Sequence, residues 1–99
     1  MSDLAYILSE TGYKNKDEYF NECFKQFLIA SKEWTDENKK EFCTKPAIYF
    51  HMSIGMWIRN IFIYDKVSDV KKLFMSDNLG GEILEYIQQK AKEEWNINE

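Results

Sequence analysis

The longest apolar stretch of the chain, Ala47–Tyr64 (AIYFHMSIGMWIRNIFIY), constrains the fold more than any other segment. On a helical wheel, one broad face of this stretch is aromatic and aliphatic, and the opposite side is largely apolar as well. The opposite side carries Ile48, Met52, Met56 and Ile63. Because a helix that is apolar all round is normally buried, the stretch predicts a central helix over about residues 46–64. Thr44 is its expected N-cap, and Pro46 suits its first turn.

Two other structures for this stretch are less favoured. A membrane span usually needs about 20 apolar residues, and this run is slightly shorter and contains Arg59 and Asn60. A pair of strands would suit its many aromatic and β-branched residues. The stretch is too long for one strand and contains no turn signal, so the helix is preferred.

Three polar or small residues interrupt the stretch at a spacing of four: His51, Gly55 and Arg59. This spacing places them in one narrow sector of a helix. In a structural interpretation, Gly55 allows close packing, His51 satisfies a buried carbonyl and Arg59 pairs with a carboxylate. In a functional interpretation, the same sector binds a small anionic ligand, since an arginine binds a carboxylate or phosphate through two parallel hydrogen bonds.

The string from His51 to Asn60 resembles the motif H-x-x-[LI]-G-x-x-I-R-N of a family of small uncharacterised bacterial helical domains. The segment from Asp77 to Leu84 is similar to the second motif of that family. The resemblance covers about residues 44–88. It implies a small helical domain with a shared arginine, and it implies no activity.

The two motifs also suggest an ion pair. An unpaired buried charge is too costly to tolerate, so Arg59, in an otherwise apolar helix, needs an acidic partner. Asp77 of the second motif is the expected partner. The pair would join the central helix to the start of the last one.

Patterns elsewhere in the chain predict further helices. A short N-terminal helix should end at Gly12, an amphipathic helix should run from a cap at Asn15 to about Lys32, and a short helix should follow Thr35. Another short helix is expected to begin at Val67 or Ser68. The run 75–81 reads as a loop, with Asp77 or Asn78 capping a final helix that buries Ile83, Leu84, Ile87, Ala91 and Trp95. We therefore predict an all-α fold, with residues 1–99 forming one bundle of roughly four to six helices.

Composition excludes several classes of function. The formal net charge is −4 and the lysines are scattered, whereas a nucleic-acid surface needs a basic stripe. Cys23, Cys43 and the single histidine are too few for a zinc site, and no phosphate-binding glycine motif occurs, so no metal or cofactor is expected.

The cysteines fit apolar helix faces and are expected to be free and at least partly buried. Residues 1–12 do not resemble a signal peptide, which favours a cytoplasmic protein without a membrane anchor.

These observations favour binding over catalysis. We expect a small acidic protein-interaction module with a protein partner, such as a toxin or an enzyme that it blocks in the manner of an immunity protein, an antitoxin or an inhibitor from a mobile element. The alternative is a small-ligand or anion-binding sensor that uses the face formed by His51, Gly55 and Arg59. The first hypothesis predicts an exposed apolar or acidic patch, and the second predicts a pocket that reaches this face. The sequence leaves the oligomeric state open.

Overall fold

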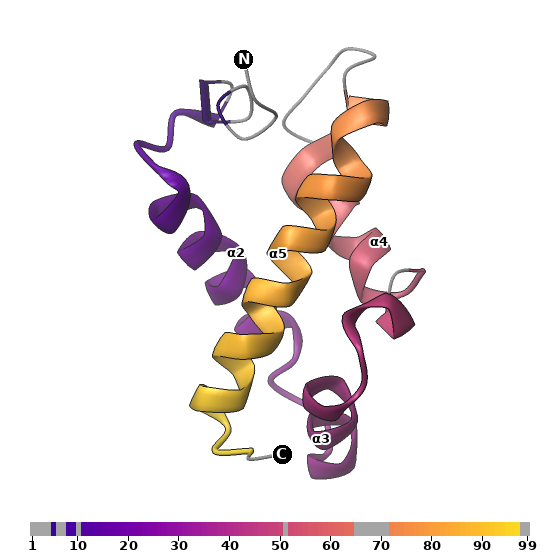
Figure 1. Cartoon of the computed structure of the whole chain (residues 1–99). Helices are drawn as coiled ribbons and strands as arrows, with labels where there is room; N and C mark the ends of the chain where they lie inside the picture. The colour runs from indigo at the N-terminus through magenta and orange to yellow at the C-terminus, as the bar shows by residue number, and fades with distance from the viewer. Residues whose placement is uncertain (1–4, 6–7, 10, 51, 65–71, 98–99) are drawn as a thin grey trace.

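The computed structural model describes residues 5, 8–9, 11–50, 52–64 and 72–97. These residues are helical apart from turns and short connections, and none of them lies in a strand, which confirms the predicted all-α fold (Figure 1). The elements are α2 (Lys16–Ala30), α3 (Asp36–Thr44), the 3-10 helix η1 (Ala47–Phe50), α4 (Ile54–Ile58), the π-helix η2 (Arg59–Tyr64) and α5 (Lys72–Glu94). No helix in the described part of the chain has both the length and the apolar character needed to cross a membrane.

Side chains that cap free backbone amides set the beginnings of α2 and α3. The Oδ1 atom of Asn15 accepts a hydrogen bond from the backbone N–H of Glu18 at 2.9 Å, and the hydroxyl of Thr35 accepts one from Asn38 at 3.1 Å. Acidic residues follow both caps, where the helix dipole favours negative charge. Both predicted helix starts are therefore confirmed.

Helix α5 is the element around which the others are arranged. It runs through the middle of the molecule, with α2 on one side and α4 on the other (Figure 1). It contacts α2, α3, η1, α4 and η2. The predicted inward face of this helix is confirmed: Ile83, Leu84, Ile87 and Ala91 are buried, and Trp95 packs partly buried against the core.

The predicted continuous central helix over residues 46–64 is wrong. The segment is divided into η1, a turn at Met52 and Ser53, α4 and η2. Ser53 has a non-helical backbone (φ −111°, ψ −89°), and its N–H donates to the carbonyl of Phe50. Thr44 does not cap this segment, because it is the last residue of α3 and its hydroxyl donates to the carbonyl of Lys40.

The predicted burial of this segment on all sides is also wrong. Its inward residues pack against one side of α5, and α2 lies on the other side of α5 (Figure 1). The inward residues are Phe50, Gly55, Ile58, Arg59 and Phe62. On the outward side, the side chains of Ile48, Met52 and Met56 are exposed. Full burial would have required neighbours on every side of the segment.

The predicted loop over residues 75–81 is helical, because α5 already begins at Lys72. Asp77 and Asn78 therefore lie inside α5 and do not cap it. Two consecutive glycines in a helix cost about 1 kcal/mol each relative to alanine. Burial of Leu79 at 2 % exposure offsets part of that cost, since a fully buried leucine contributes about 1.5–3 kcal/mol. The short helix predicted at Val67 or Ser68 begins outside the described residues.

Aromatic side chains from several elements fill the core. The ring of Phe27 in α2 stacks on Phe42 of α3 with centroids 4.9 Å apart, and it also contacts Trp34 and Trp57. The buried hydroxyl of Tyr19 donates to the carbonyl of Phe62 at 2.7 Å, which ties α2 to η2. The core therefore couples the N-terminal helices to the segment that follows α3.

Candidate functional site

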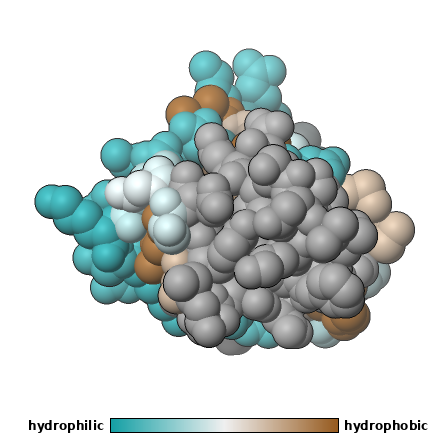
Figure 2. Space-filling model, turned by 90° about the horizontal axis from the view of Figure 1, so that it is seen from above, coloured by the Kyte–Doolittle hydropathy of each residue, from teal (hydrophilic) through white to brown (hydrophobic). Residues whose placement is uncertain are grey.

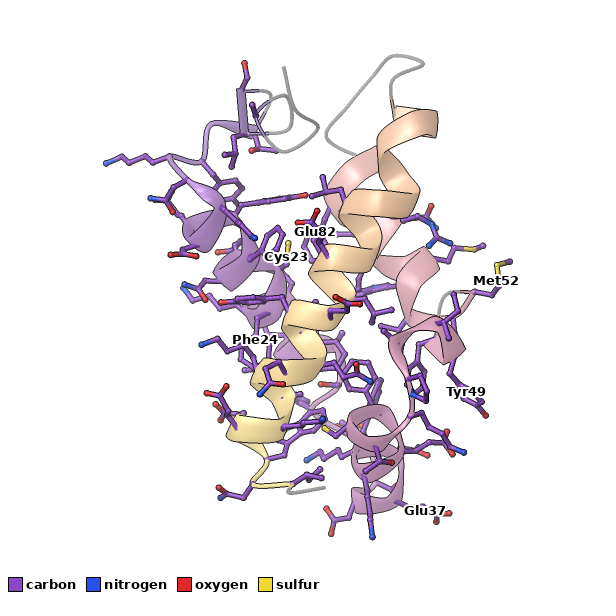
Figure 3. All side chains as sticks on the ribbon, viewed as in Figure 1. Cys23, Phe24, Glu37, Tyr49, Met52 and Glu82 are labelled. Carbon is purple, nitrogen blue, oxygen red and sulfur yellow. The ribbon has the colours of Figure 1, made fainter. Side chains whose placement is uncertain are left out.

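Four large side chains on the outward side of the segment from η1 to α4 form an exposed apolar surface. These are Ile48, Tyr49, Met52 and Met56, with exposed fractions of 77 %, 59 %, 70 % and 39 %. We call them the η1–α4 patch. In Figure 3, Tyr49 and Met52 project away from the body of the molecule, on the side opposite α2. In Figure 2, which views the molecule from above, hydrophobic atoms reach its outline on this same right-hand side.

A pocket of about 240 Å³ adjoins the patch, and the two share Tyr49. It lies between the connection after α2, the helix α3 and the segment from η1 to α4. The pocket is lined by Trp34, Asn38, Glu41, Phe42, Tyr49, Phe50, Ser53 and Ile54. Four of these eight residues are aromatic, and Glu41 is the only charged one.

Packing and hydrogen bonds hold the inner wall of this pocket in place. The buried ring of Phe42 contacts Phe50 with centroids 5.2 Å apart and contacts Trp34 edge to face at 5.8 Å. From α5, the Nε2 atom of Gln88 donates to the carbonyl of Phe42 at 2.7 Å and to that of Lys45 at 2.6 Å. These bonds satisfy carbonyls at the C-terminal end of α3, which have no partner inside their own helix. The pocket wall is thereby fixed to the core.

The outer rim of the pocket is polar. Asn38 and Glu41 lie one turn apart on α3, and both are exposed. The Nζ atom of Lys45 lies 5.3 Å from the centroid of the Tyr49 ring, within the range of a cation–π interaction. The pocket therefore offers aromatic faces at its walls and one carboxylate at its rim.

The structure brings together two of the three residues of the predicted polar sector. Gly55 is buried, and a Cβ atom placed on it would lie 3.3 Å from Nη1 of Arg59 and 3.2 Å from the carbonyl oxygen of Phe50. The predicted close approach at Gly55 is confirmed. Arg59 is 6 % exposed, so its predicted burial is confirmed too. His51 lies outside the described residues.

Two predictions about this sector remain untested. Asp77 lies in α5, but its side chain is outside the described part of the structure, so the ion pair with Arg59 stays a prediction. The ligand-binding alternative requires a pocket at Gly55 and Arg59. The three pockets described in this section are lined by other residues.

Two further pockets share no residue with the η1–α4 patch. One, of about 250 Å³, lies beside Tyr13, Glu22, Cys23 and Ile61, and the other, of about 390 Å³, lies beside Asp36, Lys40 and Trp95. Burial raises the pKa of the Cys23 thiol to about 12, so this thiol is protonated and a poor nucleophile at neutral pH. Within the described ranges, no three His, Cys, Asp or Glu side chains are placed to hold a metal ion.

Sequence reasoning did not predict the η1–α4 patch as a surface. The signal was present, because Ile48, Met52 and Met56 recur every four residues on the side opposite the inward face. We interpreted that second apolar side as evidence of burial.

Comparisons of the chain with protein-family models, with curated proteins and with solved structures give no match. The resemblance to the small bacterial helical family therefore stays a prediction.

Proposed function

We propose that the chain is a protein-interaction module and that its partner protein docks on the η1–α4 patch. The observation that carries this proposal is the gathering of Ile48, Tyr49, Met52 and Met56 on one outward face. Single exposed apolar residues are common on protein surfaces, but a group of them beside a pocket is typical of a protein-binding surface. Methionine suits such a surface because its flexible side chain adapts to a partner.

The partner is best described as a basic protein, either a toxin or an enzyme. The formal net charge of −4 favours association with a positively charged surface and speeds the encounter. In the finer form of the proposal, the chain blocks this partner, as immunity proteins, antitoxins and inhibitors from mobile elements do. It acts by binding and carries out no catalysis of its own. Its proposed location is the cytoplasm, where Cys23 and Cys43 would stay reduced.

Matched surface variants test the docking site. The chain is used to capture proteins from its host, and each captured protein is then purified and titrated against Ile48→Ser, Met52→Ser and the control Ile29→Ser. Ile29 is 65 % exposed and lies on α2, so the control removes a comparable apolar side chain outside the patch. We expect the two patch variants to bind at least tenfold more weakly, as is usual for an interface hot spot, and the control to bind normally.

Three results would contradict the proposal. In the first, the patch variants bind every purified partner as tightly as the parent chain. In the second, the Ile29 control loses as much affinity as the patch variants. In the third, light scattering shows that the chain forms a dimer that Met52→Ser disrupts, so that the patch is covered by a second copy of the chain.

A further inference from the structure

The pocket beside the η1–α4 patch has a composition that the proposed docking function does not by itself explain. Its walls contain the rings of Trp34, Phe42, Tyr49 and Phe50, and its rim contains Asn38 and Glu41. A pocket that served only as an apolar anchor site would need no carboxylate. Aromatic faces combined with one negative charge are instead suited to a cationic side chain.

We propose that this pocket binds a lysine or arginine side chain of the partner protein. The inference rests on the proposed docking function and specifies the partner's chemistry. The apolar stem of the partner's residue packs along the rings, and its charged end lies at the rim near Glu41. At about 240 Å³ the pocket has the volume of roughly eight water molecules, taking about 30 Å³ for each, which accommodates either side chain.

The charges around the pocket favour a cation over the other occupants. Glu37 precedes Glu41 by four residues on α3, so the two carboxylates share one side of that helix and repel an anion. The ammonium group of Lys45 is already within cation–π distance of Tyr49, so its positive charge opposes a second cation at that ring, whereas Glu37 and Glu41 favour one. An incoming cation would compete with Lys45 or use the pocket side of the ring.

Small amides test the pocket without any partner protein. The isotope-labelled chain is titrated with N-acetyl-lysine amide, N-acetyl-arginine amide and N-acetyl-norleucine amide, and the indole N–H signal of Trp34 reports occupancy by NMR. Norleucine amide has an apolar stem like that of lysine and no charge. We expect dissociation constants on the order of a millimolar for the two cations and binding about fivefold weaker for norleucine amide.

Two charge variants give the matched control. Glu41→Gln removes the carboxylate at the rim with little change in shape, whereas Glu85→Gln removes an exposed carboxylate on α5 that does not line the pocket. The first should weaken binding of the cations about fivefold and leave norleucine amide unaffected. The second should change neither.

The outcomes separate this inference from the proposed function. Equal binding of the lysine and norleucine amides, no effect of Glu41→Gln, or no change in the Trp34 signal would overturn the cation-binding pocket. If a purified partner is sensitive to Met52→Ser but not to Glu41→Gln, the pocket inference fails and the docking function stands. If neither variant changes partner binding, both fail.

Discussion

Replacing Gly55 with alanine tests whether a close approach organises the segment beneath α5. A Cβ atom at this position would lie 3.2 Å from the carbonyl oxygen of Phe50, 3.3 Å from Nη1 of Arg59 and 3.8 Å from Cδ2 of Leu84. The first two distances are shorter than ordinary van der Waals contact. The Phe50 oxygen is held by hydrogen bonds from the N–H and the hydroxyl of Ser53, and Arg59 is buried. Neither neighbour can move freely.

The magnitude follows from two opposing terms. Alanine in place of glycine stabilises a helix interior by up to about 1 kcal/mol, and by less here because Gly55 is near the start of the five-residue helix α4. Crowding of a packed site typically costs about 1–3 kcal/mol. We therefore expect Gly55→Ala to lower the free energy of unfolding by about 1–2 kcal/mol. The melting temperature should fall by roughly 4–16 °C for a domain of this size.

Gly81 provides a matched control for the same substitution. It lies inside the 23-residue helix α5, and a Cβ atom there would have nothing within 4 Å. Gly81→Ala should therefore raise the free energy of unfolding by about 1 kcal/mol. Calorimetry and urea unfolding of both variants measure the two signs. If Gly55→Ala is stabilised as much as Gly81→Ala, the site is open and the close-packing argument is wrong.

Two other predictions concern buried polar groups. Burial raises the pKa of the Cys23 thiol from 9.0 to about 12, so the thiol should react slowly in the native protein. Above pH 9 the unfolded chain loses this proton and the folded chain keeps it, so the free energy of unfolding should fall by about 1.4 kcal/mol per pH unit, whereas below pH 9 the thiol should cause no such fall. Thiol labelling measures the reactivity, and rapid labelling of the native protein would contradict the first prediction. Urea unfolding between pH 8 and 10 measures the pH dependence. An identical decline in the parent protein and in Cys23→Ala would contradict the second prediction. Arg59→Met should destabilise the domain by about 3–5 kcal/mol, and Asp77→Asn by less, as measured by thermal unfolding. An Arg59→Met variant that keeps its stability but loses binding would place Arg59 in a functional site instead.

The parts of the fold that the sequence predicted correctly depend on short-range physics. A capping side chain such as Asn15 or Thr35 acts within three residues, and the inward face of α5 follows from helical periodicity. The buried free cysteines were predictable for the same reason, since Cys23 lies on the apolar face of α2.

The errors arose where distant contacts decide the outcome. The apolar character of Ile48 and Met52 is evident in the sequence, but whether another helix covers them depends on the arrangement of the whole chain. The sequence also did not show that the segment before Gly81 is helical, because the burial of Leu79, which offsets part of the local preference for a loop, depends on distant contacts. The pocket requires Trp34, Glu41 and Tyr49 to meet, and no local motif connects them.

The central position of α5 has a consequence for the way the protein is made. Helices α2 and α3 and the segment up to Tyr64 leave the ribosome before α5 does, yet all of them pack against α5. At about 5–20 residues per second, synthesis of the 23 residues of α5 takes roughly 1–5 s. During this interval the inward residues of the earlier elements lack the surface of α5, although contacts such as that of Phe27 with Phe42 can already form. The nascent chain then exposes part of its core as well as its docking patch. A chaperone that shields apolar segments would therefore act on this protein mainly before α5 emerges.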